Sequence, residues 1–364
     1  MIKSNTKIKQ NLHLYPPEVL LNNRLEKDVQ RMFYPFYCSL LLVCSSKYRI
    51  RNNYITPNGK MLNILSFMSV IYILVICIYY MYFDKSDISY INVHSDIVVS
   101  FITFFSFVSF FIAVIMIFVV NIVHSNNNIS LIVLIQSIHK NIDLSKIIRC
   151  FIIGNWITVF ICFGFNFFIL IGFQAGYTLS LLYLPQLIRN YILIKIDVDC
   201  IYAIRVMVLL TRYLNEWIRI IPKINNTQET NICCIKLFKI YQNILEAYKL
   251  YKNIFKILQL EILQTPHMTS TIILWIIKDI LFAFFQSLQC EKFYIAIEEA
   301  ETVCIQLVKK NYDQARLCKK VLQANRTFSK MTACGLFYVD ATLPISLMAL
   351  LATYVVVLLQ FAFL

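Results

Sequence analysis

Residues 61–83, MLNILSFMSVIYILVICIYYMYF, form an uninterrupted apolar run that contains no charged residue. The hydrocarbon core of a bilayer is about 30 Å thick and an α-helix rises about 1.5 Å per residue, so about 20 apolar residues cross it. The run therefore predicts a transmembrane helix. Its tyrosines gather towards the C-terminal end, as expected for aromatic side chains at a membrane–water interface.

The composition of the whole chain supports the same conclusion. Of its 364 residues, 59% are hydrophobic and 15% are charged, whereas a soluble domain carries about 25% charged residues. The net charge is +14, but the Lys and Arg residues lie between the apolar runs. We therefore interpret them as cytoplasmic loop charges that follow the positive-inside rule, and we expect the lipid bilayer, not nucleic acid, as a partner.

Motifs of enzymes and of metal sites are absent from the sequence. The 12 cysteines and five histidines show neither paired CxxC motifs nor zinc spacing, and HExxH, Walker and GxSxG motifs do not occur. We expect no enzymatic activity, no cofactor and no metal site.

Further apolar runs predict additional transmembrane helices. They lie at about 97–123, 150–173, 178–212, 271–289 and 343–361. A shorter run at 32–46 is interrupted by Pro35 and predicts an interfacial or re-entrant helix, because fifteen residues rarely span a bilayer. The segment 213–263 is amphipathic and basic, so we expect it to be cytoplasmic and to pack against protein or the membrane surface.

The predicted helix 178–212 carries several charged side chains. Charges within a bilayer are costly and usually face protein or a water-filled cavity. Two interpretations stay open: the charges line a cavity, or they lie beyond the roughly 20 residues that cross the membrane. The residues concerned are Arg189, Lys195, Asp197, Asp199 and Arg205.

The distribution of basic residues predicts the orientation of the chain. The segments 1–60, 124–149, 213–253 and 291–342 carry 10, 3, 6 and 8 Lys and Arg residues, whereas 84–96 carries one. Basic segments stay on the cytoplasmic side. We therefore expect a cytoplasmic N-terminus.

This orientation requires two crossings between the last two basic segments, and only 271–289 is long and apolar enough to be one of them. The other would lie at 254–268, which is short and contains two charged residues and a proline. Three explanations are open: a distorted half-span, a six-span chain with an inverted last helix, or a missing exon near 264–270. We favour the third.

The C-terminal sequence carries the most specific pattern. Residues 331–361 are MTACGLFYVDATLPISLMALLATYVVVLLQF. The final part resembles the TYhhhhhQF signature of insect gustatory receptors, where h is hydrophobic, and the preceding ACGLFYVDATL resembles that family's G-L-F-h-h-D-x-x-L stretch. The matching residues are Thr353, Tyr354, Gln360, Phe361, Gly335, Phe337 and Asp340.

The resemblance implies an all-α, multi-pass transmembrane protein of the seven-span insect chemoreceptor type, with the fifth span apparently truncated here. Family members are ligand-gated, non-selective cation channels that are opened by small-molecule tastants in chemosensory neurons. They lie in the plasma membrane with a cytoplasmic N-terminus and an extracellular C-terminus. They assemble as homo- or hetero-tetramers with other gustatory receptors, and the last helix of each subunit lines the pore.

This organisation divides the chain into six expected regions. They are 1–60 (cytoplasmic N-terminal region with a short interfacial helix), 61–212 (first four transmembrane helices), 213–263 (cytoplasmic amphipathic anchor), 264–290 (remnant fifth and sixth transmembrane region), 291–342 (cytoplasmic helical linker) and 343–364 (pore-lining last helix).

The resemblance places a pore face on the last helix. This face consists of Thr353, Val356 or Val357, and Gln360. The valines follow Thr353 by three and four residues and Gln360 follows it by seven, so all of them lie on one face of the helix. Four copies would form an apolar constriction with amide rings, which suits a gate that works by dewetting. We also expect Asp340 to cap this helix.

The ligand pocket of the family lies among the outer halves of the second to sixth spans, where Tyr183, Gln186 and Tyr191 are candidate ligand-binding residues. A G-protein-coupled receptor is an alternative, but neither a DRY-like triplet nor an NPxxY motif occurs in the expected places. A non-functional, truncated member of the family is the other alternative.

Overall fold

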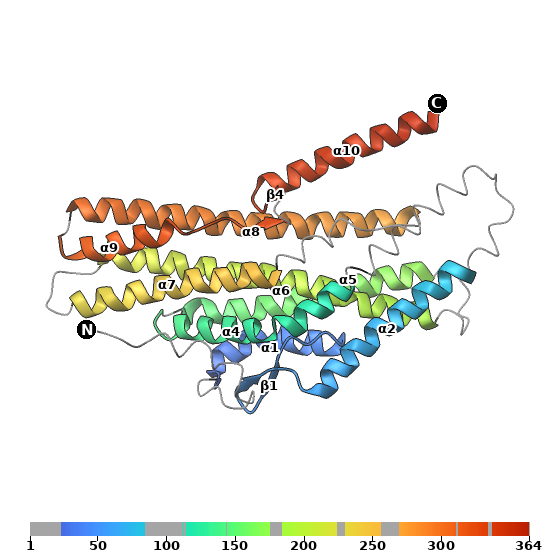
Figure 1. Ribbon diagram of the computed structural model, residues 1–364, viewed down its shortest axis with the longest axis horizontal. Helices are drawn as coiled ribbons and strands as arrows, with labels where there is room; N and C mark the ends of the chain where they lie inside the picture. The colour runs from blue at the N-terminus through green and yellow to red at the C-terminus, as the bar shows by residue number, and fades with distance from the viewer. Residues whose placement is uncertain are drawn as a thin grey trace, which may run out of the picture.

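The computed structural model describes residues 23–83, 112, 114–142, 144–174, 184–223, 230–255, 269–310, 312–333 and 337–363. This part of the chain is mostly helical, and its longest helices run side by side along the long axis of the molecule (Figure 1). The expected all-α class is therefore confirmed, and the only strands in these ranges form two short hairpins.

The helices and strands have the following bounds. They are α1 Lys27–Leu42, β1 Arg49–Arg51, β2 Tyr54–Thr56, α2 Lys60–Phe83, α4 Ser125–His139, α5 Ser145–Gln174, α6 Leu184–Ile220, α7 Thr230–Phe255, α8 Thr269–Lys310, α9 Tyr312–Asn325, β3 Thr332–Ala333, β4 Phe337–Tyr338 and α10 Thr342–Phe363.

The β1–β2 hairpin has a local explanation in its turn. Arg51 pairs with Tyr54, so Asn52 and Asn53 form a two-residue connection, and both have positive φ angles of 50° and 66°. Asparagine tolerates this left-handed conformation better than most residues, and two such residues give the turn type that matches the twist of a hairpin.

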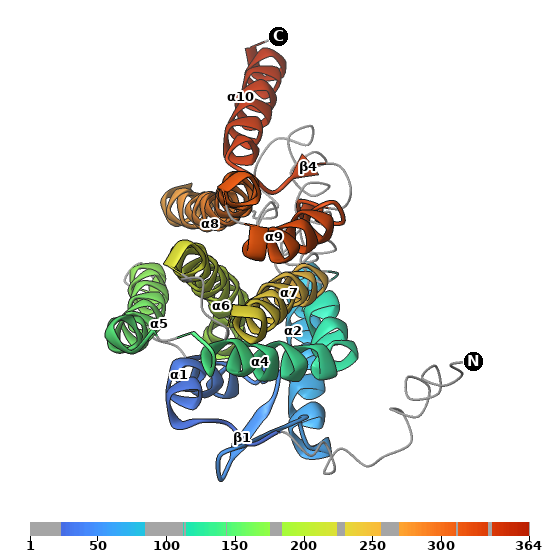
Figure 2. The same cartoon turned by 90° about the vertical axis from the view of Figure 1, so that its left-hand side faces the viewer.

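Helix α6 lies at the centre of the bundle. It packs against α5, α7 and α8, and Figure 2, which looks along the bundle, shows these three helices around it. Its inward residues include fully buried Tyr202, Tyr213 and Trp217. Because α5, α7 and α8 all pack against α6, this helix positions them and the side chains that they carry.

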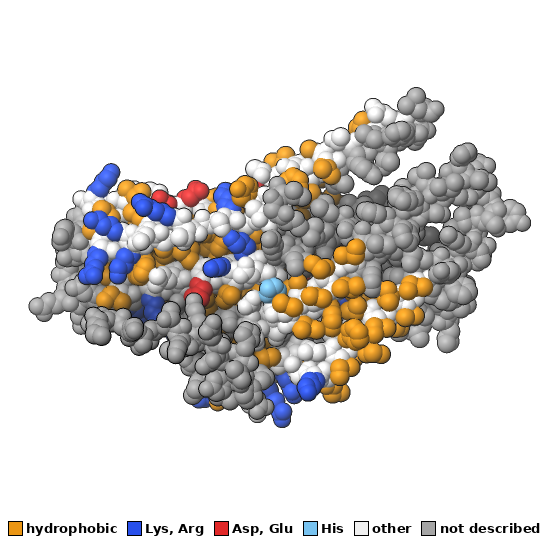
Figure 3. All heavy atoms as spheres, viewed as in Figure 1, with side chains coloured by type: hydrophobic (Ala, Val, Ile, Leu, Met, Phe, Trp, Pro, Cys, Tyr) orange, Lys and Arg blue, Asp and Glu red, His pale blue; other side chains and the backbone are white. Residues whose placement is uncertain are grey.

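The two ends of the molecule differ in surface chemistry. Large hydrophobic side chains are exposed over α2, where Ile64, Leu65, Phe67 and Met68 are each about half exposed, and Lys and Arg side chains gather at the opposite end, where α8 meets α9 (Figure 3). Exposed apolar patches of this kind mark contact with a membrane or with other proteins. The separation along the long axis agrees with one end in a bilayer and one in water.

Apart from α10, several of whose side chains are not described, two helices in the described ranges are long and apolar enough to cross a membrane. They lie within Ile147–Phe168 of α5 and Ile277–Lys309 of α8, and a third candidate arises if Val114–Val123 and Ser125–His139, bent by 62° at their junction, are counted as one span. At about 1.5 Å per residue the 42-residue α8 is about 63 Å long. Only about half of α8 therefore fits within a bilayer core.

Several expected elements take a different form. Residues 32–42 of the run 32–46 belong to α1, whose Val29, Phe33, Phe36 and Leu40 are buried against the bundle. Its expected position at the membrane interface stays a prediction. Pro35 is accommodated within α1. The apolar face of this short helix is covered by protein because α5 and α6 pack against it.

The boundary expected at 290–291, between the sixth transmembrane region and the cytoplasmic helical linker, falls within one continuous helix, α8. The boundary between membrane and cytoplasm at this point stays a prediction. The expected loop at 124–149 contains helix α4, which packs against α7. The described parts of the amphipathic segment 213–263 are the end of α6, a short 3-10 turn at Ile221–Lys223, and α7, and the apolar face of α7 packs against protein. Most of the expected second span at 97–123, and residues 256–268 of the expected fifth crossing at 254–268, lie outside the described residues.

Candidate functional site

Helix α10 differs from the other helices in its surroundings. It has 22 residues and no charged residue, and it projects away from the bundle, with its main contacts near its start to α8 and β4 (Figure 2). Ile345, Met348, Leu350 and Val356 are exposed in the single chain. A helix that is apolar on all sides is stable only when lipid or other protein covers it.

The start of α10 is defined by Asp340. The backbone N–H of Thr342 donates to Asp340 Oδ1 at 3.0 Å, and the Thr342 hydroxyl donates to the same oxygen at 2.5 Å. Pro344 lies in the first turn, where a missing N–H removes no helix hydrogen bond. The expected capping role of Asp340 is confirmed.

Removal of this cap gives a first testable prediction. Asp340→Ala leaves the Thr342 N–H at the start of α10 without its side-chain acceptor, which costs about 1 kcal/mol. We expect hydrogen exchange in the first turn of α10 to become about fivefold faster, measured by mass spectrometry on purified protein. Asp340→Ser keeps a capping oxygen and should retain the slow exchange; equal exchange in Asp340→Ala and the native protein would contradict the role.

The pore-face candidates whose side chains the structure describes are solvent-exposed in the single chain. Thr353, Val356 and Gln360 are all exposed, and the Thr353 hydroxyl donates to the Ala349 carbonyl oxygen at 2.9 Å. The side chains of Val357, Tyr354 and Phe361, and residue Gly335, lie outside the described part, and Phe337 is exposed on β4. The three described candidates are thus available for contact with another subunit or with water.

The candidate ligand residues do not form a described pocket. Tyr183 lies outside the described residues, and Gln186 is on α6 with a side chain that is not described. Tyr191 is also on α6, and 40% of its surface is exposed. The placement of these three residues as a ligand site therefore stays a prediction.

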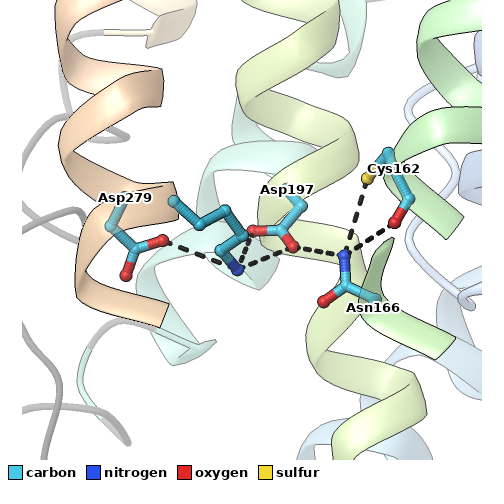
Figure 4. Close-up of polar contacts among 5 residues, drawn as sticks. Cys162, Asn166, Asp197 and Asp279 are labelled. Carbon is cyan, nitrogen blue, oxygen red and sulfur yellow. Dashed lines mark hydrogen bonds and ion pairs between the residues drawn. The ribbon is translucent and has the colours of Figure 1, made fainter. Parts of the chain in front are cut away.

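A buried group of charged side chains joins α5, α6 and α8 (Figure 4). Lys278 Nζ lies 2.8 Å from both carboxylate oxygens of Asp197 and 3.5 Å from Asp279 Oδ1. Asn166 Nδ2 donates to Asp197 Oδ2 at 2.7 Å and to the Cys162 carbonyl oxygen at 2.9 Å. Every oxygen of Asp197 thus has a partner, which is the condition for keeping a carboxylate in an apolar interior.

A second ion pair connects the N-terminal part to the other side of α6. Lys47 Nζ lies 3.2 Å from Asp199 Oδ1, and both side chains are almost fully buried. Lys47 Nζ also donates to Asn121 Oδ1 at 2.8 Å, and Asn121 Nδ2 donates to Ser45 Oγ at 3.0 Å. A small cavity adjoins this pair and is lined by Lys47, Ile117, Val120, Asn121, Asp199, Ile254 and Phe255.

Arg205 makes a third long-range contact from α6. Its Nε donates to Asn155 Oδ1 at 2.6 Å and its Nη2 to the Phe151 carbonyl oxygen at 3.1 Å. Gly154 leaves room for the guanidinium, because a Cβ at this position would lie 2.9 Å from Arg205 Nη2. Asp197, Asp199 and Arg205 of α6 therefore face protein, and Asp199 also lines the small cavity.

The pairing of these charges was not visible in the sequence. The sequence predicts charged residues on this helix, among them Asp197, Asp199 and Arg205. It does not indicate which residues contact them, and the structure shows these to be Lys278, Lys47 and Asn155. A signal existed for Lys278, because Lys278 and Asp279 interrupt the apolar run 271–289. No group of three or more His, Cys, Asp or Glu residues in the described ranges is arranged to hold a metal ion.

No family model matches the chain, and no curated protein matches it. Function must therefore be inferred from the residues. Two features stand out: the uncharged α10 with exposed Thr353, Val356 and Gln360, and the buried ion pairs around α6 that hold the bundle together.

Proposed function

We propose that this chain is a subunit of a ligand-gated, non-selective cation channel of the insect gustatory receptor type, opened by a small-molecule tastant. The observation that carries the proposal is α10. Its sequence resembles the terminal signature of that family, and in the single chain its Thr353, Val356 and Gln360 are exposed and have no core to enter. An uncharged 22-residue helix is about 33 Å long, enough to cross a bilayer.

Four copies of α10 around a central axis would give these side chains a common environment. Val356 would form an apolar constriction, which can close a pore by excluding water, and Gln360 would form a ring of amide groups that replaces part of the hydration shell of a cation. A closed cyclic arrangement uses one surface of each copy against its neighbour. The remaining faces of α10 would contact lipid and neighbouring subunits, whether identical or other gustatory receptors.

The proposed location is the plasma membrane, with a cytoplasmic N-terminus and an extracellular C-terminus. The basic end at α8 and α9 supports a cytoplasmic position for that end of the bundle (Figure 3). The seven-span arrangement requires a further crossing near 254–268. Sequencing of the transcript across codons 255–275 checks whether an exon is missing there.

Whole-cell recording tests the proposed channel. Cells that express the protein, with surface labelling of a C-terminal tag on intact cells, are exposed to sucrose, fructose, caffeine and quinine. We expect a cation current, basal or evoked, that persists when G proteins are blocked. A tag that is labelled only after permeabilisation would contradict the orientation, and a current abolished by G-protein block would contradict the channel.

A further inference from the structure

The segment that leads from the end of α9 to the hairpin before α10 contacts α7 and α8 at several points. We call residues 325–331, NRTFSKM, the strap. The Tyr241 hydroxyl of α7 donates to Asn325 Oδ1 at the beginning of the strap. Lys252 Nζ, further along α7, donates to Ser329 Oγ at 2.7 Å. The strap therefore follows α7 in the same direction.

Phe328 anchors the middle of the strap in an aromatic cluster. Its ring centroid lies 5.2 Å from that of Tyr248 on α7, and 5.9 Å and 6.3 Å from those of Tyr294 and Phe293 on α8. Tyr248, Tyr294 and Phe293 are buried. Aromatic pairs at these separations contribute favourable edge and face contacts in addition to area burial. Phe328 therefore brings the strap into contact with both α7 and α8.

A continuous series of hydrogen bonds runs from this cluster to the start of α10. The Tyr248 hydroxyl donates to Tyr294 Oη at 3.2 Å, and the Met331 N–H donates to the same oxygen at 3.1 Å. The Met331 carbonyl oxygen then accepts from the Val339 N–H at 2.9 Å. Val339 directly precedes Asp340, whose side chain caps α10.

Met331 is fully buried at the point where the strap enters the hairpin. Its N–H faces α8 and its carbonyl oxygen faces the strand that leads into α10, so a displacement of α8 against α7 moves Val339 and Asp340 through hydrogen-bonded backbone. The bulk of α10, in contrast, lies away from the bundle (Figure 1). The strap is thus a polar route by which the bundle positions α10, in addition to the direct contact of α10 with α8.

We propose that Tyr294, together with Tyr248 and the strap, is the joint that transmits movement of α7 and α8 to the pore helix α10. The inference rests on the proposed channel function and deepens it, because it assigns positioning residues for gating that lie outside the pore. Tyr294 acts through Met331 and does not touch the permeating ion. A two-state element is required for such coupling, and the test must therefore measure gating.

The experiment removes one hydroxyl at a time. Tyr294→Phe keeps the ring and its packing but leaves the Met331 N–H without its acceptor. We expect a rise of about fivefold in the half-maximal concentration of whichever of sucrose, fructose, caffeine or quinine gives the largest native current, the effect of one neutral hydrogen bond. Single-channel conductance and surface expression should not change, since the pore is intact.

Tyr248→Phe removes the hydroxyl that donates to Tyr294 Oη. The double variant Tyr248→Phe with Tyr294→Phe tests whether the two hydroxyls act together. The two shifts should be non-additive, because both variants act on the same oxygen. Tyr338→Phe is the matched control: it makes the same chemical change on β4, where the side chain is 59% exposed, and should leave the half-maximal concentration unchanged.

Ser329→Ala provides a second test that does not disturb the buried cluster. It removes the exposed contact with Lys252 and should shift the half-maximal concentration in the same direction by a smaller factor. Native-like gating in both Tyr294→Phe and Ser329→Ala would overturn the joint while leaving the channel intact. A native protein that reaches the surface but passes neither basal nor evoked current would reject the channel and, with it, the joint.

Discussion

Lys278→Met should strongly destabilise the protein and reduce the amount that reaches the cell surface. The change leaves Asp197, whose side chain is 4% exposed, without its cationic partner. Loss of one member of a buried ion pair costs about 3–5 kcal/mol, which is a large part of the 5–15 kcal/mol that separates folded from unfolded domains. Fluorescence-detected size-exclusion chromatography after heating, together with surface labelling, measures the effect.

The double variant Asp197→Asn with Lys278→Met separates charge from packing. It removes the charges of Lys278 and Asp197, so within this group only Asp279, whose side chain is 16% exposed, still loses its cationic partner. Much of the lost stability should therefore return. Lys236→Met on the exposed side of α7 is the control for removal of a lysine and should resemble the native protein. Native thermal stability of Lys278→Met would show that the contact of Lys278 with Asp197 does not stabilise the bundle.

The sequence was informative where a structure depends on local chemistry. The apolar runs at 150–173 and 178–212 correspond to α5 and α6, because length and hydrophobicity alone determine whether a helix can be covered by lipid or protein. The cap at Asp340 was likewise predictable, since a capping side chain bonds the backbone of the next few residues.

Long-range pairing was not predictable in the same way. Asp197 and Lys278 are 81 residues apart, and nothing in the local pattern around Asp197 specifies which helix will face it. For this reason the sequence leaves open whether the charges of this helix line a cavity or lie beyond the residues that cross the membrane. The same limit explains α1, whose apolar face is buried only because α5 and α6 happen to pack there.

The expected boundary at 290–291 concerns the surroundings of a helix. Hydropathy falls at this point because charged residues begin, which predicts a change from membrane to water around the chain. The stretch 271–310 contains neither glycine nor proline, so the backbone has no reason to leave the helix. Hydropathy indicates whether lipid, protein or water surrounds a helix. Glycine, proline and capping residues indicate where the helix begins or ends.

Gln360→Lys should abolish the cation current. In the proposed tetramer the substitution places four ammonium groups around the pore axis. Each unit charge at about 4 Å repels a cation with about 1 kcal/mol even at the dielectric constant of water, so four raise the barrier by about 4 kcal/mol, nearly a thousandfold in rate. Gln360→Glu creates an acidic ring instead and should increase the permeability to divalent relative to monovalent cations. Reversal potentials in solutions of defined ions measure both effects.

Cysteine substitution decides whether the face assigned to the pore is the one that contacts water. Thr353 and Met348 are both exposed in the single chain, but at 3.6 residues per turn they lie about 140° apart around α10. A charged thiol reagent added to open channels should block Thr353→Cys and leave Met348→Cys unaffected, because only the former faces the ion path. Block of Met348→Cys with no block of Thr353→Cys would assign the opposite face to the pore, and block of neither, with current present, would move the pore away from α10.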